Sequence, residues 1–185
     1  MKPRTQIHGL RRPDRVVAFA IAALGMLAVA PGAALAESSG GTSTSPTSPP
    51  GAVAQLLPSG QAVPPAGAPP RVVRAIEFAN RIRKKPYKYG GGHSGWKVDR
   101  GYDCSGAVSY MLHGARVLRS PLDSGGLARW GERGEGQWIS VYANRGHAYA
   151  IVAGLRWDTS GGKGPRWHEE MRSTAGYKVR HYEGY

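Results

Sequence analysis

The sequence predicts an α+β domain in which helices pack on an antiparallel sheet. Two stretches with helical periodicity lie within residues 71–115, and strand-like stretches begin only at residue 137. Helices that precede strands, rather than alternating with them, are typical of this class. The expected domain, residues 71–185, has a size that suits a single hydrophobic core.

The first 36 residues are expected to be a signal peptide. Residues 1–15 hold five basic residues and one acid, residues 16–30 are apolar and uncharged, and an Ala-x-Ala site ends at Ala36. This order is that of a secretory signal. The apolar run has 15 residues, whereas a membrane-spanning helix needs roughly 20, although an uncleaved anchor is the alternative. We therefore expect a secreted or periplasmic protein with no membrane span after cleavage.

Residues 37–70 are expected to be a disordered linker. Ser, Thr, Pro, Gly and Ala dominate this segment, and its only apolar cluster is AVAQLL at residues 52–57. Such a composition buries too little apolar surface to offset the entropy of ordering. The linker would act as a flexible tether for the domain.

The first helix of the domain is predicted over residues 71–85. Apolar residues recur on one face at helical spacing, with charges opposite, and Pro86 ends the helix. The apolar face consists of Val72, Ala75, Ile76, Ala79 and Ile82.

The second helix is predicted to begin at the sequence Asp-Cys-Ser-Gly, residues 103–106. Asp103 and Ser105 favour a helix start, and Gly114 marks the end. Its apolar residues are Ala107, Val108, Met111, Leu112 and Ala115. Cys104 thus falls in the first turn, where unpaired N–H groups and the helix dipole favour a thiolate.

The remaining residues predict loops and strands. A Gly-rich loop covers residues 87–102, and a turn-rich segment, residues 120–136, contains a possible short helix at residues 126–130. Strands are expected over residues 137–144, as two strands within residues 147–160 that turn at Ala153-Gly154, and over residues 177–182.

The register of the predicted hairpin brings two polar residues together. If residues 153 and 154 form the loop, Tyr149 faces Asp158 and His147 faces Ser160. Asp158 is then a diagonal neighbour of His147, about 7–8 Å away between Cα atoms, within reach of a hydrogen bond. A slip of one residue would destroy this pairing.

Cys104 is the only cysteine of the chain, so it cannot form an internal disulfide. A buried apolar cysteine, a bridge to a partner and a reactive thiol remain possible. In the predicted fold, Cys104, His147 and Asp158 can serve as nucleophile, base and orienting group. The backbone N–H groups of Cys104 and Ser105 could then act as oxyanion donors.

The chain is strongly basic, with a formal net charge of +13. From residue 71 onward, 20 Lys and Arg stand against 10 Asp and Glu, a net charge of +10. A basic protein attracts anionic partners. Because the signal peptide predicts export, we expect an anionic cell-wall surface rather than nucleic acid.

Four segments together resemble the NlpC family of bacterial cell-wall cysteine peptidases, which have a papain-like fold. They are PYKYGGG (86–92), GYDCSGAVSYML (101–112), SPLDSGGLARWG (120–131) and GHAYAIVAG (146–154). The combination P-Y-x-x-G-G followed by D-C-S-G is specific as a pair. With Asp158 included, the resemblance spans residues 86–158.

The resemblance implies that Cys104 is the nucleophile, His147 the base and Tyr87 a hydrogen-bonding group near the thiolate. Asp158, eleven residues beyond His147, stands near the place of the family's third polar residue. The implied reaction is hydrolysis of an amide in peptidoglycan stem peptides, between D-glutamate and the diamino acid. No metal or cofactor is implied, and we expect a monomer.

Other readings stay open. The domain could bind the wall without catalysis, or transfer an acyl group from the same thioester to an amine. Trp130 and Trp96 are the tryptophans expected in the cleft, and His93 in the Gly-rich loop is a further candidate. His168 lacks the paired histidine of a zinc motif and is expected at the surface.

Overall fold

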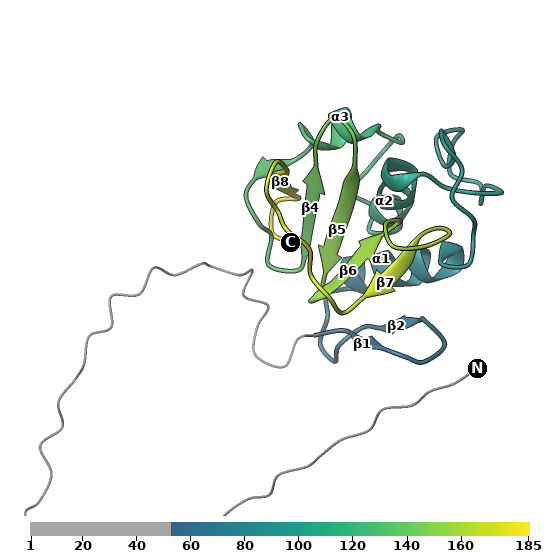
Figure 1. The fold of residues 1–185 in the computed structure, drawn as a ribbon. Helices are drawn as coiled ribbons and strands as arrows, with labels where there is room; N and C mark the ends of the chain where they lie inside the picture. Colours follow the sequence, from purple (N-terminus) through teal and green to yellow (C-terminus); the bar gives the residue numbers. More distant parts are fainter. Residues whose placement is uncertain (1–52) are drawn as a thin grey trace, which may run out of the picture. The chain divides into compact units, whose positions relative to one another are not determined.

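A computed structural model describes residues 53–185, in which helices α1 and α2 lie against one large antiparallel sheet (Figure 1). The strand order of this sheet is β3-β8-β4-β5-β6-β7. The strands are β3 (Glu132–Arg133), β4 (Ile139–Ala143), β5 (Ala148–Val152), β6 (Leu155–Asp158), β7 (Arg166–His168) and β8 (Lys178–His181). The predicted α+β class is confirmed.

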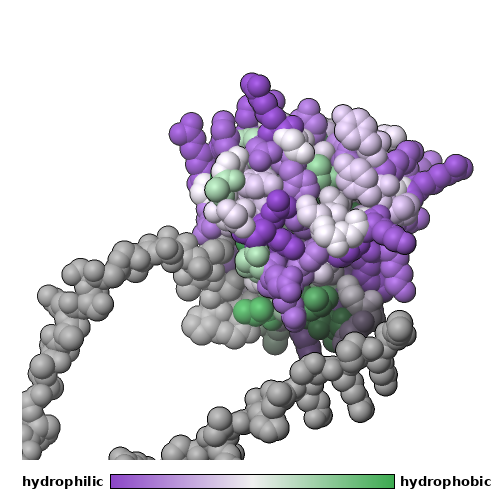
Figure 2. Space-filling model, in the orientation of Figure 1, coloured by the Kyte–Doolittle hydropathy of each residue, from purple (hydrophilic) through white to green (hydrophobic). Residues whose placement is uncertain are grey.

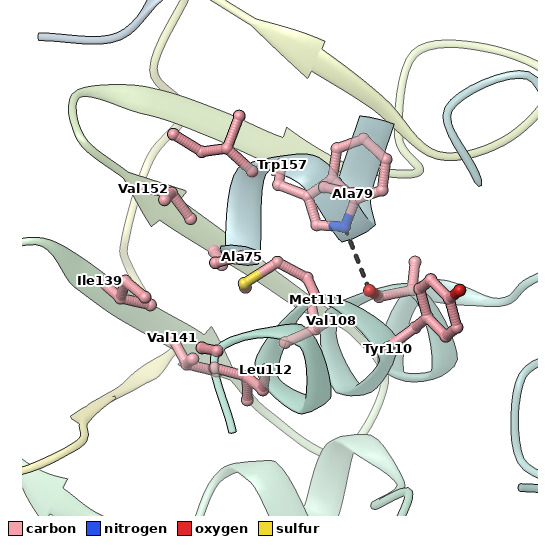
Figure 3. Packing of buried hydrophobic residues seen from close by; sticks show 14 of the residues in the cluster. Ala75, Ala79, Val108, Tyr110, Met111, Leu112, Ile139, Val141, Val152 and Trp157 are labelled. Carbon is pink, nitrogen blue, oxygen red and sulfur yellow. Dashed lines mark hydrogen bonds between the residues drawn. The ribbon is translucent and has the colours of Figure 1, made fainter. Parts of the chain in front are cut away.

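The two long helices, α1 (Pro70–Ile82) and α2 (Cys104–Gly114), begin and end close to their predicted positions. All five residues of the predicted apolar face of α1 are fully buried. The α2 helix is buried along nearly its whole length and packs on α1, β5 and β6. Figure 3 shows Met111 and Leu112 of α2 in the core beside Val141 of β4.

The β5–β6 hairpin has the predicted register. Ala150 pairs with Trp157 and Val152 with Leu155. The two loop residues, Ala153 and Gly154, both have positive φ values, 45° and 80°. This is the geometry of a tight hairpin turn whose twist matches that of the flanking strands. The carboxylate of Asp158 therefore emerges beside His147.

Both faces of the central sheet are covered. Every residue of β4 is buried, including Ser140 and Tyr142, whose positions alternate with apolar ones. The ring of Tyr142 stacks on Tyr149 of β5, with centroids 4.8 Å apart. One face thus packs on the helices, and the other carries a layer of aromatic side chains.

Residues 53–70 differ from the linker expected there. They contain a hairpin of β1 (Gln55–Leu56) and β2 (Ala62–Val63). The N–H of Ala54 donates to the carbonyl of Ala153 at 2.8 Å. The side chain of Asn80 in α1 bonds both backbone groups of Ala62, at 3.0 and 2.8 Å. Backbone hydrogen bonds and the apolar cluster noted in the sequence hold this segment on the domain, which composition alone did not reveal.

Other elements were misplaced or missed. The short helix α3 spans Ser124–Leu127 instead of residues 126–130, because Asp123 caps it by accepting from the N–H of Gly126 at 2.6 Å. The strands β3 and β7 have two and three residues, too few for a periodic pattern. β7 pairs antiparallel with β6, with Trp167 opposite Trp157.

The predicted signal peptide, residues 1–36, and residues 37–52 of the predicted linker lie outside the described residues. Within residues 53–185, no helix is long and apolar enough to cross a membrane. The face drawn in Figure 2 is mostly hydrophilic, and its apolar colour gathers at the lower edge, where Figure 1 draws the β1–β2 hairpin.

Candidate active site

Cys104 is the first residue of α2, as predicted. Asp103 precedes it as the N-cap and accepts a hydrogen bond from the N–H of Gly106 at 2.7 Å. The N–H groups of Cys104 and Ser105 have no acceptor among the described residues. The half-buried Cys104 therefore lies beside two available N–H donors at the positive end of a buried helix.

The Gly-rich loop lies directly against this first turn. The N–H of Gly90 donates to Asp103 at 3.0 Å, and the N–H of Asp103 donates to Gly91. A Cβ atom at Gly106 would collide with the carbonyl of Gly91. The glycine of the Asp-Cys-Ser-Gly sequence is thus required for loop and helix to approach this closely.

His147 stands at the end of the turn between β4 and β5. The side chain of Asn144 accepts from the N–H groups of Gly146 and His147, each at 2.9 Å, and the N–H of Asn144 donates to the carbonyl of His147 at 3.0 Å. These bonds fix the backbone from which the imidazole projects.

The imidazole lies between Cys104 and Asp158. Its Nε2 is 2.8 Å from Oδ1 of Asp158 and 3.2 Å from Oγ of Ser160. Cys104 also acts on the ring of His147, since its charge favours the protonated imidazole. Because Nε2 faces the carboxylate, Nδ1 is the ring nitrogen left for the sulfur. The expected contact between His147 and Asp158 is present.

The electrostatics of this group favour a charged imidazole. Burial acts against the charge, but the hydrogen bond to Asp158 and the nearby Cys104 outweigh it and raise the pKa of His147 to about 9. Burial likewise disfavours the Asp158 carboxylate, yet the bonds from His147 and from the N–H of Ser160 hold the pKa of Asp158 well below its usual range. Near neutral pH, Asp158 is therefore ionised beside a protonated ring.

Arg172 completes the surroundings of Asp158, and no sequence pattern indicated this residue. Its Nη1 donates to Oδ2 of Asp158 at 3.0 Å and to Oγ of Ser160 at 3.1 Å. The guanidinium lies over the rings of Tyr149 and Tyr177, 5.2 and 5.4 Å from their centroids. The aromatic layer of the outer sheet face thus holds the arginine that fixes the carboxylate.

A buried hydrogen bond connects the cysteine helix to the aspartate strand. The indole N–H of Trp157 donates to the carbonyl of Ala107 at 3.1 Å (Figure 3). Trp157 precedes Asp158, and Ala107 lies three residues after Cys104. This contact sets the distance between the two elements that carry the candidate residues.

A second histidine–aspartate pair lies next to Cys104. Nε2 of His93 is 3.0 Å from Oδ1 of Asp103. The hydroxyl of Ser105 donates to the same oxygen at 3.1 Å and lies 3.3 Å from Nε2 of His93. His93 was only an alternative candidate from the sequence, since loop spacing does not reveal that its loop folds back onto the helix.

Cys104 opens into a groove of about 620 Å³. Its lining includes Tyr87, Tyr89 and His93, the start of α3, and Arg129 and Arg145. Burial, followed by the negative charges of Cys104 and Asp103, raises the pKa of the Tyr87 hydroxyl. The predicted residues Tyr87 and Ser105 thus both line the groove.

The two tryptophans expected in the cleft do not line this groove. Trp130 stacks on Tyr182, with centroids 6.4 Å apart, because α3 ends at Leu127 and the next turn directs Arg129 to the groove instead. Trp96 stacks on His113 at 4.0 Å and donates to the carbonyl of Arg119. Residues 53–185 contain no cluster of side chains suited to hold a metal ion.

No protein-family model matches this chain, and no curated protein does. Solved structures similar to it include the Resuscitation Promoting Factor Interacting protein RipA mutated at a histidine, with 22% identity over 60% of this chain and 62% of that one and a TM-score of 0.46. Another is Rv1477, a hypothetical invasion protein of Mycobacterium tuberculosis, with 21% identity over 69% and 71% and a TM-score of 0.46. This chain thus spans about 62% of the RipA chain.

Proposed function

We propose that this chain is an exported cysteine peptidase of the NlpC family that hydrolyses an amide in peptidoglycan stem peptides. The observation that carries the proposal is the placement of Cys104 at the start of α2 and in an open groove, with a nearby His147 that is hydrogen-bonded to Asp158. A merely buried cysteine would not need an imidazole, a fully buried carboxylate or access to solvent.

The geometry supports a two-step reaction. The thiolate of Cys104 attacks the carbonyl carbon, and the imidazolium of His147 gives its proton to the leaving nitrogen, which departs as an amine. A thioester remains. Water then adds to the thioester while His147 accepts its proton, and the thiol leaves as the acid is released. The sum is amide plus water to acid plus amine.

The N–H groups at the start of α2 are the proposed oxyanion donors. Those of Cys104 and Ser105 are available, and they adjoin the sulfur. In comparable sites, removal of one such donor costs roughly 3–4 kcal/mol of transition-state stabilisation. The Tyr87 hydroxyl, which feels the charge of Cys104, is a further polar group for this pocket.

The groove supports the choice of the bond between D-glutamate and the diamino acid. A glutamate linked through its side chain keeps a free α-carboxylate close to the scissile amide. Arg129 and Arg145 line the groove and have no carboxylate of the described residues within 4.0 Å. Two unpaired guanidinium groups are suited to bind carboxylates of the substrate.

The experiment compares wild type with Cys104→Ala on purified sacculi and on a soluble stem peptide. We expect the wild type to release new amine termini, mass spectrometry to place the cleavage after D-glutamate, and the alanine variant to release none. Labelling with iodoacetamide near neutral pH should be fast for the wild type. Retention on sacculi without cleavage would support a silent wall-binding domain, and products lengthened by an added amine would support a transferase.

A further inference from the structure

We propose that a cationic depression beside the C-terminus of α1 binds a linear phosphate polymer. The depression has a volume of about 400 Å³. Its five charged lining residues are all basic: Arg83, Lys84, Lys85, Lys163 and Arg166. Binding there does not require the thiol chemistry proposed for Cys104, so the site is a second function of the domain.

The fold itself assembles this cluster from two distant segments. Residues 83–85 follow α1, whereas Lys163 lies between β6 and β7 and Arg166 is the first residue of β7. A Cβ atom at Gly164 would collide with the carbonyl of Lys85, so only glycine allows this approach. The carbonyl of Lys163 also accepts from the N–H of Tyr87. The two basic segments are therefore held together by backbone contacts rather than by chance.

The five charges are not neutralised by the part of the chain that the structure describes. No carboxylate lies within 4.0 Å of any of them. The guanidinium groups are anchored, since Nη1 of Arg83 donates to Asn80 and Nη1 of Arg166 donates to Gly161, both at 2.8 Å. Nε of Arg83 is buried without a partner. Like charges that line one depression repel one another, and a bound anion reduces that cost.

The form of the site favours a polymer of phosphates over a single small anion. Lys84 and Lys163 are exposed, and flexible ammonium groups suit phosphates as point charges, while arginine binds them with paired N–H donors. Five cations exceed the charge of one carboxylate or phosphate. Pro86 lines this depression and the next residue, Tyr87, lines the Cys104 groove. A polymer attached to a surface and bound in the depression would therefore keep the groove close to that surface.

The test measures binding of inorganic polyphosphate to the full chain at low salt. The variant removes three charges with Lys84→Gln, Lys85→Gln and Lys163→Gln. The matched control removes three elsewhere with Lys97→Gln, Arg100→Gln and Lys178→Gln. The basic residues of segment 1–15 are the same in all three proteins. Each cation removed from the site should lower the affinity roughly fivefold. We therefore expect the dissociation constant to rise about 100-fold in the variant and less than about threefold in the control. The affinity of the variant should also depend less on salt concentration.

Equal weakening in the two triple variants would overturn the proposal, because net charge alone would then explain binding. Poly-glutamate of matched charge binding as tightly as polyphosphate would overturn the phosphate assignment, and tighter binding of a single-stranded oligonucleotide would indicate a nucleic-acid site. Hydrolysis of the soluble stem peptide, measured on the same preparations, should be unchanged. An absence of hydrolysis in all three proteins would count against the proposed peptidase but not against this site.

Discussion

Two histidine–aspartate pairs border Cys104, and they resemble each other in geometry but not in surroundings. The Nε2–Oδ1 distance is 2.8 Å in His147–Asp158 and 3.0 Å in His93–Asp103. The side chain of Asp158 is 0% exposed and that of Asp103 is 11% exposed. A short histidine–carboxylate contact beside a cysteine is therefore not enough to identify the catalytic base.

The difference lies in what each carboxylate holds. Asp103 accepts from the backbone N–H groups of Gly90 and Gly106 and so joins the Gly-rich loop to the start of α2. Asp158 accepts from one backbone N–H, that of Ser160, and otherwise from side chains, chiefly His147 and Arg172. Asp103 therefore stabilises the backbone of the loop and the helix, whereas Asp158 orients the imidazole of His147. Of the two histidines, His147 is the one whose pKa is raised by Cys104 as well as by its carboxylate.

The largest expected effect on activity is that of replacing His147, the proposed base. His147→Ala removes the group that takes and returns the proton, and we expect kcat/KM on the stem peptide to fall about 10²- to 10⁴-fold. His93→Ala should lower it less than about tenfold, since His93 bonds Asp103 and Ser105 at the wall of the groove and has no proposed part in proton transfer. Thermal unfolding of both variants provides the control for folding. Losses of similar size in the two variants would contradict the assignment of His147 as base.

The dependence of activity on pH tests whether His147 is the group that protonates the leaving amine. The pKa of His147 is raised to about 9, so the imidazolium that protonates the leaving amine is present below that pH and is lost as pH rises through it. We expect kcat/KM to fall above about pH 9. The same shift contributes stability that is complete below about pH 6.5 and is lost as pH rises through about 9.

Two asparagine variants show which of the two carboxylates controls the pH dependence of kcat/KM. Asp158→Asn removes the negative charge that favours the imidazolium, so the alkaline fall in kcat/KM should move toward the ordinary pKa of histidine, about 6.5. Asp103→Asn is the matched control and should leave its position unchanged, and because asparagine also caps helices, the start of α2 should be retained. A wild-type fall already near pH 6.5, or an equal displacement in both variants, would count against the pairing proposed here.

Sequence reasoning located the His147 pair because its geometry follows from local patterns. The apolar stripes fixed both helices, and the Ala153-Gly154 turn fixed a register in which Asp158 had to emerge beside His147. Likewise, Asp103 as a helix cap placed Cys104 in the first turn. Each of these inferences depends on residues close together in the sequence.

The parts that could not be predicted depend on distant contacts. The Gly-rich loop carries no periodicity, so nothing in it indicated that His93 bonds Asp103. Arg172 lies fourteen residues beyond Asp158, in a segment without regular structure, and its place depends on two tyrosine rings from separate parts of the chain. Trp130 was misplaced because the start of α3 was set two residues late. The β1–β2 hairpin is held by Asn80 and Ala153, neither of which is near it in sequence.

The smallest expected effect concerns Arg172 as a positioning residue. Arg172→Gln removes the donor that fixes Oδ2 of Asp158 and Oγ of Ser160, so the carboxylate should stay ionised but become less well oriented. We expect kcat to fall up to about tenfold with little change in KM, and the free energy of unfolding to fall by about 1.5 kcal/mol. Arg133→Gln, at an exposed site on β3, is the control.

A conservative variant distinguishes orientation from charge alone. Arg172→Lys keeps the positive charge near Asp158 but cannot reproduce the planar guanidinium that lies over Tyr149 and Tyr177. If orientation matters, kcat of Arg172→Lys should stay close to that of Arg172→Gln. Full recovery of kcat with lysine would show that charge neutralisation alone is required. A flexible ammonium group near Asp158 would then be enough to keep its carboxylate directed at His147. The bonds that fix the guanidinium of Arg172 would therefore not be what distinguishes Asp158 from Asp103.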